Sequence, residues 1–431
     1  MESIGIGLAG FGTVGAGVFQ ALQRNAELLY RRLGVRFEVR RIAMRHPAKK
    51  RAIAAPEKLI TTDWSDLVND PSIRIIVELM GGTEEPLNLF RSAIAAKKIL
   101  ITANKALLAN HGIEIFQLAE AANVPIFYEA AVAGGIPIIK SLREAFVGNH
   151  FESIHGILNG TSNYILTRMT ESNMDFHQAL GEAQSHGFAE ADPTLDVNGW
   201  DAAHKAIILA SLAYGFWLNS VDIQVGGIEN ISPLDIQFAR ELGYTIKLLA
   251  SIRSHLDEKI EVSVHPALIP QAHVLASVNG VFNAILIRGD IVGESLFYGR
   301  GAGQDPTASS VLGDLAEAAQ AVAFPRASCG FKPHNLRGQV KEAHSCVSSF
   351  YLRLDVDDRP GVLAQIANIL GRAQIGISSV IQPEGKDTHQ THLVLMLHNA
   401  PTGAASEAVS QIATLSCVKG KPVLLHVEHF A

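Results

Sequence analysis

The hydrophobic pattern of the first third of the chain alternates between two periods. Short, nearly continuous apolar runs at residues 4–9, 73–78 and 99–102 are typical of strands that are buried on both faces. Between them lie stretches with apolar residues every three or four positions, such as 87–98, which predict helices. Strands that alternate with helices in this way predict a parallel sheet with right-handed crossovers. We therefore expect residues 1–128 to form an α/β domain of the Rossmann type.

The pattern becomes mixed after residue 128. Residues 129–303 combine helical stretches with strands and predict an α+β domain built on a sheet. A further helix within residues 304–330, periodic over 307–323, is expected to return to the first domain. Residues 331–347 are polar, contain Pro and Gly, and predict a linker.

The last part of the chain, residues 348–431, follows a third pattern. Its predicted elements are a strand at 349–356, a helix at 363–372, a strand at 375–381, a strand at 392–397, a helix at 404–415 and a strand at 422–427. This βαββαβ order predicts a small ferredoxin-like domain.

Composition and charge exclude several classes of protein. The chain has 431 residues, of which 48% are hydrophobic, so it can bury several cores, and about three domains are expected at roughly 150 residues each. The net charge of −6 comes without a basic stripe, so we expect no nucleic-acid partner. Residues 4–19 carry six glycines instead of the pattern of a signal peptide, and the apolar helical stretch at 206–221 is shorter than the ~20 residues of a membrane span. We expect no membrane anchor.

Cysteine usage points to the compartment. Cys329, Cys346 and Cys417 are the three cysteines, and no two of them form a CxxC pair. A disulfide framework and a structural zinc site are therefore not expected, and a reducing, cytoplasmic location is favoured. The pair His389 and His392 has no third ligand nearby, so we expect no metal there.

A glycine-rich turn follows the first predicted strand and opens a helix. Its residues are Gly10, Phe11, Gly12, Thr13, Val14 and Gly15. In this pattern the first glycine permits the tight turn, the second lets the backbone approach a pyrophosphate, and the third allows close helix–strand packing. The start of the helix offers N–H groups and a positive dipole end to the phosphates. The turn predicts a dinucleotide site, the alternative being an ordinary apolar turn.

The end of the second strand bears on the choice of nucleotide. An acidic residue there would bind the ribose 2′-hydroxyl of NAD. The sequence instead has Arg45 and His46, followed by Lys49, Lys50 and Arg51, with no carboxylate placed to repel a 2′-phosphate. This favours NADP(H), with NAD(H) and a solvated basic loop as the alternatives.

Two lysines are candidates for proton transfer during reduction of a carbonyl. Lys105 opens a helix after a strand, near the edge of the sheet where ligands bind. Asp201 and Lys205 are four residues apart and share one helical face. The alternative is an exposed ion pair, but the helix becomes almost wholly apolar from Ala206 onward, which favours a partly buried lysine near a carboxylate.

Six motifs, in order along residues 1–330, resemble the homoserine dehydrogenase family. They are LAGFGTVG (8–15), VELMGG (77–82), TANKALLA (102–109), ILNGTSNYIL (157–166), GFAEADPTLDVNGWDAAHK (187–205) and GRGAGQDPTASSV (299–311). The last 80 residues or so resemble an ACT domain, with DDRPGVL (357–363) as its strand-to-helix loop. The resemblance implies NAD(P)H-dependent interconversion of L-aspartate 4-semialdehyde and L-homoserine, in threonine and methionine biosynthesis.

The resemblance also implies roles for individual residues. Lys205 matches the proton-transfer lysine, with Asp201 beside it, Lys105 matches a lysine between nicotinamide and substrate, and Glu190 matches the carboxylate that holds the substrate amino group. The cofactor positions of the family match Phe11, Thr13, Val14, Arg45, Gly303 and, close by, Gly187. Its monovalent-cation site, for Na⁺ or a similar ion, matches Glu129 and the carbonyls of Val132, Gly134 and Ile136. By the same resemblance, residues 129–303 bind substrate and form a homodimer or homotetramer, and threonine acts as an effector at the ACT domain.

Two other functions are weaker readings of the same residues. An aspartate-semialdehyde dehydrogenase needs a nucleophilic cysteine near the cleft, yet all three cysteines follow residue 328. An amino-acid sensor with a catalytically dead scaffold disagrees with the intact set Glu190, Asp201 and Lys205. An enzyme acting on a small amino-acid substrate is the favoured interpretation.

Overall fold

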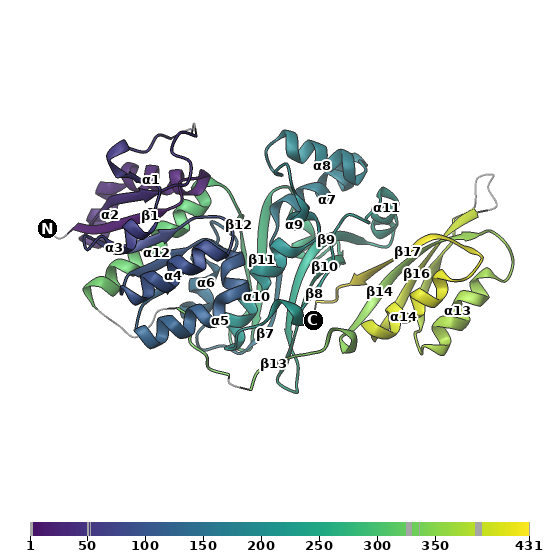
Figure 1. The fold of residues 1–431 in the computed structure, drawn as a ribbon. Coiled ribbons are helices and arrows are strands. Elements are labelled where there is room, and N and C mark those ends of the chain that lie inside the picture. Colours follow the sequence, from purple (N-terminus) through teal and green to yellow (C-terminus); the bar gives the residue numbers. More distant parts are fainter. Residues whose placement is uncertain are drawn as a thin grey trace. The chain divides into compact units, whose positions relative to one another are not determined.

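The computed structural model describes residues 3–49, 51, 53–324, 330–335, 337–383 and 390–430. Lys50, Cys329 and His389, which the sequence singled out, lie outside these residues. The chain forms two compact units (Figure 1). Unit 1 comprises Met1–Phe151, His204–Ser220 and Ile287–Gly338, and unit 2 comprises Glu152–Ala203, Val221–Leu286 and Gln339–Ala431. The domain boundaries expected from the sequence stay a prediction.

Unit 1 contains a six-stranded parallel sheet with the order β3-β2-β1-β4-β5-β6. Its strands are β1 (Ser3–Ala9), β2 (Arg36–Ala43), β3 (Ile60–Thr61), β4 (Ile73–Glu78), β5 (Ile99–Thr102) and β6 (Ile126–Phe127). The central strands β1, β4 and β5 are buried along almost their whole length, as their continuous apolar runs indicate. The predicted parallel, Rossmann-like sheet is confirmed.

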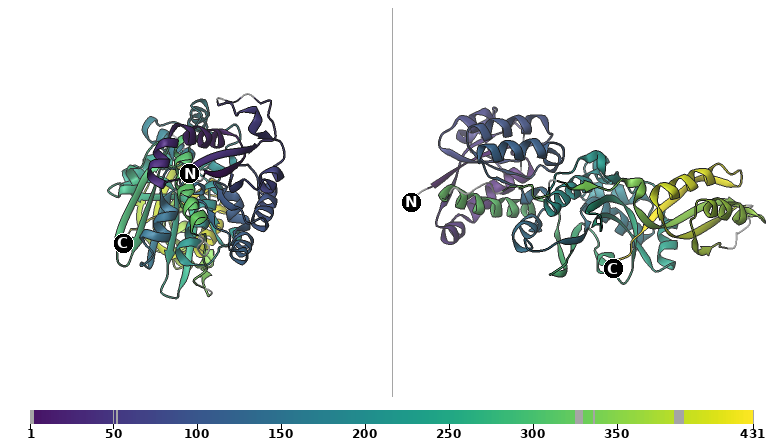
Figure 2. Two further views of the ribbon diagram at one scale, coloured as in Figure 1. Left: turned by 90° about the vertical axis from the view of Figure 1, so that its left-hand side faces the viewer. Right: turned by 90° about the horizontal axis from the view of Figure 1, so that it is seen from below.

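Helices from both ends of unit 1 cover this sheet. They are α1 (Thr13–Arg24), α2 (Ala26–Leu33), α3 (Ser65–Asn69), α4 (Glu84–Ala95), α5 (Lys105–Ala122) and α12 (Gln304–Ala323). The short α6 (Ile138–Lys140) follows the loop of Glu129. The green helix α12 lies beside the purple α1 (Figures 1 and 2). Val311 and Leu315 of α12 share one apolar core with Ile6 and Leu8 of β1 and Val18 of α1. Residues distant in sequence therefore complete the packing around the glycine turn.

Unit 2 contains a mixed sheet that runs β11-β7-β9-β10-β17-β14-β16-β15. Its strands are β7 (Phe151–Ile157), β9 (Tyr244–Ser254), β10 (Lys259–Pro270), β11 (Phe282–Gly289), β14 (Val347–Asp357), β15 (Ile377–Ile381), β16 (Gln390–Pro401) and β17 (Val418–Val427). Its helices are α7 (Gly160–Ser172), α8 (Phe176–Ser185), α9 (Thr194–Val197), α11 (Pro233–Glu241), α13 (Val362–Arg372) and α14 (Thr402–Ala413).

Strand β17 connects two halves of unit 2, one built on β7, β9, β10 and β11 and the other on β14, β15 and β16. It pairs antiparallel with β14, and it pairs in parallel with the end of β10 at Ala267–His426 and Leu268–Val427. The residues predicted to be a linker also take part in this connection, because β13 (Gln339–Val340) pairs with β10. Part of that segment is therefore structured.

A buried charge network joins the same two halves. Asp235 of α11 is fully buried and accepts hydrogen bonds from Arg353 Nε at 2.6 Å, Arg353 Nη2 at 3.3 Å and the Tyr351 hydroxyl at 3.1 Å. The hydroxyl of Ser232 donates to the same carboxylate at 2.6 Å. Each charge thus has a partner, which offsets the cost of removing it from water.

No helix among the described residues is long and apolar enough to cross a lipid bilayer.

We predict that Asp235→Ala strongly destabilises the protein. The substitution leaves the buried guanidinium of Arg353 with only Asp355 at 3.0 Å, so the free energy of unfolding should fall by about 3 kcal/mol, measured by urea denaturation. Glu114→Ala is the matched control, because it removes an exposed ion pair with Arg91 of the same 2.6 Å length and should cost less than about 1 kcal/mol. Equal losses in the two variants would contradict the prediction.

Candidate active site

The glycine turn is held tightly against the end of β4. Gly10 has a φ of +105°, and a β-carbon there would lie 2.5 Å from the carbonyl oxygen of Leu79. A β-carbon at Gly15 would lie 2.3 Å from the carbonyl oxygen of Gly10. Gly12 differs from both, because a β-carbon there would meet nothing within 4 Å. The first and third glycines thus serve packing, while the second faces open space at the start of α1.

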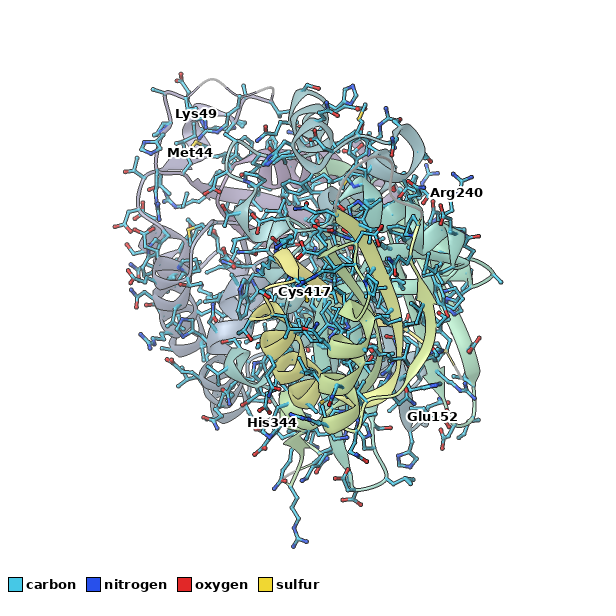
Figure 3. The ribbon with its side chains drawn as sticks, turned by 90° about the vertical axis from the view of Figure 1, so that its right-hand side faces the viewer. Met44, Lys49, Glu152, Arg240, His344 and Cys417 are labelled. Atoms are coloured by element: carbon cyan, nitrogen blue, oxygen red, sulfur yellow. The ribbon has the colours of Figure 1, made fainter. Side chains whose placement is uncertain are left out.

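A cavity of about 1330 Å³ opens at this turn, within unit 1. It is larger than the roughly 300–1,000 Å³ of a typical small-ligand site, so it can hold an extended dinucleotide. Its walls come from the glycine turn, the loop after β2, the loop after β4 and the start of α12; Figure 3 labels two wall residues, Met44 and Lys49. Of the predicted cofactor residues, the cavity is lined by Gly10, Phe11, Gly12, Thr13 and Arg45. The lining does not include Val14, Gly15, Lys105, Gly187 or Gly303, although Gln304 belongs to it.

The basic loop after β2 has carboxylates beside it, which corrects the expectation from sequence. Asp63, Glu84 and Glu85 line the same cavity. The guanidinium of Arg45 donates to Glu85 at 3.1 Å through Nε and at 2.5 Å through Nη2. These carboxylates come from the segment before α3 and from α4, so the sequence around Arg45 gave no sign of them.

Arg51 ties the basic loop to the glycine turn. Its Nε donates to the Phe11 carbonyl at 2.8 Å, and its two other nitrogens donate to the carbonyls of Lys49 and His46 at 2.8 and 3.0 Å. The guanidinium therefore braces two walls of the cavity.

Glu78 ends β4 at the carboxyl edge of the sheet and is fully buried. Its carboxylate accepts hydrogen bonds from Thr102 Oγ1 at 2.6 Å and from the Met80 backbone N–H at 2.7 Å. Burial raises the pKa of this carboxyl to about 7, although hydrogen bonds from Thr102, Met80 and Asn104 oppose the shift. We did not single Glu78 out from sequence, yet a carboxylate that ends an apolar strand was a usable signal.

Lys205 and Asp201 lie on helix α10 (Trp200–Tyr214) and are both buried, at 7% and 8% exposed. This excludes the alternative of a solvated surface ion pair. Asp201 belongs to unit 2 and Lys205 to unit 1. Lys105 begins α5 in unit 1 and is partly buried, whereas Glu190 and Gly187 are exposed in the loop after α8 in unit 2.

Asn159 orients Asp201 and was missed from sequence. Its Nδ2 donates to Asp201 Oδ2 at 2.8 Å and to Asp196 Oδ1 at 2.6 Å, while its Oδ1 accepts from Ser162 N at 2.7 Å and caps α7. An asparagine before a helix predicts a cap, but its bonds to two carboxylates depend on tertiary packing.

The Glu129 loop holds a second buried carboxylate in unit 1. Its two oxygens accept from the backbone N–H groups of Ile139 at 2.9 Å and Lys140 at 2.8 Å, and burial raises its pKa. Ala133 and Gly134 in the same loop both have left-handed φ values, and Ser310 donates to the Gly134 carbonyl at 2.5 Å. The described residues contain no cluster of three or more His, Cys, Asp or Glu side chains suited to a metal ion.

Comparison with known proteins identifies relatives over the whole chain. A family model for the homoserine dehydrogenase NAD-binding domain matches residues 10–129, and a homoserine dehydrogenase model matches residues 137–316. Homoserine dehydrogenase of Pseudomonas aeruginosa is 42% identical over 99% of both chains. The crystal structure of a homoserine dehydrogenase from Thiobacillus denitrificans is 42% identical, with a TM-score of 0.93 over 99% of this chain and 98% of that one. A hyperthermophilic archaeal homoserine dehydrogenase in complex with NADPH is 27% identical, with a TM-score of 0.62 over 76% of this chain and all of that one.

We predict that Gly12→Ala removes cofactor binding without weakening the fold. The new β-carbon has room within the protein but would occupy the space through which a pyrophosphate approaches the backbone. The affinity for NADPH, measured by fluorescence titration, should fall by about tenfold or more, with an unchanged melting temperature.

Gly181→Ala serves as the control, because it adds a β-carbon in open space on α8. It should leave NADPH affinity unchanged, with an equal or slightly higher melting temperature because alanine favours the helix. Wild-type NADPH affinity in Gly12→Ala would contradict a pyrophosphate at this turn.

Proposed function

The chain belongs to the homoserine dehydrogenase family, an NAD(P)-dependent oxidoreductase family that acts on a hydroxyl group, and we propose which of its residues interconvert L-homoserine and L-aspartate 4-semialdehyde. The observation that carries the proposal is the burial of Lys205 on a helix that also bears Asp201. A buried lysine that shares a helical face with a carboxylate is suited to moving a proton in a site shielded from water.

The proposed chemistry divides the work between the cofactor and the chain. When bound, the nicotinamide cofactor would supply the acceptor for the hydride that leaves the carbon carrying the hydroxyl group of homoserine. In the oxidising direction, Lys205 takes the proton from the hydroxyl oxygen of homoserine. In the reducing direction, it returns that proton to the alkoxide that develops on this oxygen. By the family resemblance, Lys105 at the start of α5 would lie between nicotinamide and substrate, and Glu190 would hold the substrate amino group.

Asp201 has a positioning role in this proposal. Asn159 holds its carboxylate through a 2.8 Å hydrogen bond, so Asp201 presents a fixed negative charge on the helical face of Lys205. A fixed charge there keeps the amine oriented through both directions of the reaction.

The preferred cofactor is NADP(H), with NAD(H) as the alternative. The ion pair between Arg45 and Glu85 is exposed and stabilises the protein by less than about 1 kcal/mol, so a 2′-phosphate with its larger charge can displace Glu85 from Arg45. Lys49 lines the same cavity and adds a second cation.

A monovalent cation such as Na⁺ is assigned to the loop of Glu129. The residues fit an ion with oxygen ligands, because Glu129 supplies a buried carboxylate and, within the described part of the chain, each of its oxygens accepts a single backbone hydrogen bond. The carbonyls of Val132, Gly134 and Ile136 would complete the site. The ion would then hold this loop against the start of α6.

Regulation by threonine is assigned to residues 348–431, as an ACT domain. Both family models end before this region, at residues 129 and 316, so it is additional to the matched catalytic parts. Strand β15 lies at the end of its sheet and pairs only with β16 within the described residues, so a second copy can pair with its outer edge. Such pairing is expected in a homodimer or homotetramer.

Replacing Lys205 tests the catalytic assignment. Lys205→Ala should lower kcat for homoserine oxidation by about 10²–10⁴-fold, because the hydroxyl proton loses its acceptor, while NADPH binding by fluorescence persists. Lys259→Ala removes an exposed lysine of unit 2 and should leave kcat unchanged. Near-normal turnover in Lys205→Ala would refute the assignment.

Cofactor preference can be tested with two variants of one ion pair. Arg45→Ala should weaken NADPH binding by about tenfold, since a charge-assisted hydrogen bond to the 2′-phosphate is lost. Glu85→Gln should instead strengthen it, because a competing carboxylate disappears. Initial rates with NAD, which lacks the phosphate, provide the control and should change little in both variants.

Threonine regulation predicts inhibition that depends on the β15 edge. L-threonine should lower the initial rate of the wild-type enzyme, and D-threonine should not. Val380→Lys places a charge on this exposed edge and should weaken the inhibition while basal kcat is kept. Equal rates over a wide range of L-threonine concentration would remove the regulatory proposal.

A further inference from the structure

Glu78 is a buried carboxylate that the proposed chemistry does not use. It lies in register between Ala9 of β1 and Thr102 of β5, so neither flanking strand places a charged side chain beside it. The groups that bind it are the Thr102 hydroxyl, the Met80 backbone N–H and the side chain of Asn104. A carboxylate in such a position destabilises the fold when it ionises, so its presence calls for an explanation other than stability.

Hydrogen bonds connect Glu78 to the start of α5. Thr102 Oγ1 donates to Glu78 and accepts from the backbone N–H of Asn104 at 2.9 Å. Asn104 Oδ1 accepts from Leu107 N at 3.0 Å and so caps α5, whose first residue is Lys105. The position of the Lys105 backbone thus depends on a chain of bonds that begins at Glu78.

The same network reaches the wall of the nucleotide cavity. Asn104 Nδ2 donates to the Gly82 carbonyl at 2.8 Å, and Glu78 accepts from Met80 N. Met80 and Gly82 both line the cavity. Glu78 therefore ties the loop after β4 to the residue that precedes Lys105.

The hydrogen bonds to residue 78 require two acceptor oxygens, which a carboxylate has. The Met80 N–H and the Thr102 O–H are both donors, and they point at different oxygens of Glu78. A glutamine has one acceptor oxygen, so one of the two donors would face its NH₂ group. Thr102 has a single proton, and turning it away from residue 78 would disturb its bond with Asn104.

We propose that Glu78 is a positioning residue that, through Thr102 and Asn104, places Lys105 and the Met80–Gly82 loop for reaction at the nicotinamide end of the cofactor site. The inference deepens the proposed function, because it rests on the role of Lys105 between nicotinamide and substrate. Thr102 and Asn104 belong to the same positioning unit.

The test compares Glu78→Gln and Thr102→Val with the wild-type enzyme, and Thr102→Ser provides the conservative rescue. Glu78→Gln and Thr102→Val should each lower kcat/KM for homoserine oxidation by about tenfold or more, since small misplacements of a catalytic group have effects of this size. Thr102→Ser keeps the hydroxyl and should retain wild-type kcat/KM. NADPH affinity should change less than kcat/KM in Glu78→Gln and Thr102→Val, and neither quantity should change in Thr102→Ser.

Thermal stability and pH separate this role from a structural one. Because the pKa of Glu78 is raised to about 7, the folded protein loses stability as pH rises from about 4.5 to 7, where the unfolded chain ionises and the folded one stays protonated, and Glu78→Gln should melt at an equal or higher temperature at pH 8. The ratio of wild-type to Glu78→Gln kcat/KM should grow as pH rises through about 7, where the ionised acceptor forms. A lower melting temperature with wild-type kcat/KM would overturn the proposal.

A double-mutant cycle with Lys105→Met separates this inference from the proposed function. If Glu78 acts through Lys105, Glu78→Gln should have little further effect on kcat in the Lys105→Met background. An equal loss in both backgrounds would overturn the inference, while wild-type kcat in Lys105→Met would overturn the role of Lys105 itself. If Glu78→Gln does not fold, the same cycle with Thr102→Val decides the question.

Discussion

The close approach of the glycine turn to the end of β4 determines the arrangement of unit 1. The Gly10 N–H donates to the Ala43 carbonyl at 2.9 Å, and the Leu79 N–H donates to the Ala9 carbonyl at 2.7 Å, so the ends of three parallel strands meet at one point. A side chain at Gly10 would separate them, because its β-carbon would lie within the contact distance of the Leu79 carbonyl. The cavity floor, the start of α1 and the loop that carries Met80 all take their positions from this contact.

The buried ionisable groups of the chain are stabilised in different ways, and the difference tracks their proposed roles. Asp235 is paired with a guanidinium and joins two parts of unit 2. Lys247 is almost fully buried and donates to the Val278 carbonyl and to two asparagine oxygens, which orders the loop after β10, and burial lowers its pKa to about 8. Among the described residues, Glu78 is bound by hydrogen-bond donors alone, at the edge of the sheet where ligands bind. Ionising a buried group without a counter-charge costs more free energy than ionising a paired one. The unpaired carboxylate, Glu78, is the one beside the nucleotide cavity.

Local patterns in the sequence predicted the sheet of unit 1 and the nature of its glycine turn, because strand burial and turn geometry depend on neighbouring residues. The burial of Lys205 could also be predicted from sequence, because the apolar residues that follow it leave α10 little exposed surface. The pairing of Arg45 with Glu85 could not be predicted from sequence, because the two residues are 40 positions apart and meet only when the loop after β2 and the start of α4 come together in the fold. The hydrogen bonds of Asn159 to Asp196 and Asp201 could not be predicted for the same reason, because the three residues meet only in the folded chain. Motif resemblance supplied residue roles that no local pattern contains.

Strand β17 joins the two halves of unit 2 by backbone pairing, whereas a flexible hinge would join them by a single connecting segment. Its backbone belongs at once to the ladder with β14 and to the ladder with β10. Successive amides of a strand point to opposite neighbours, so each amide of β17 near His426 is protected by either β14 or β10. If the two halves form one cooperative foldon, the amides on both sides should exchange with deuterated water at similar rates. A slip of β17 by one residue would turn its side chains to the opposite face along its whole length. The register of β17 is therefore fixed by both halves of unit 2 together.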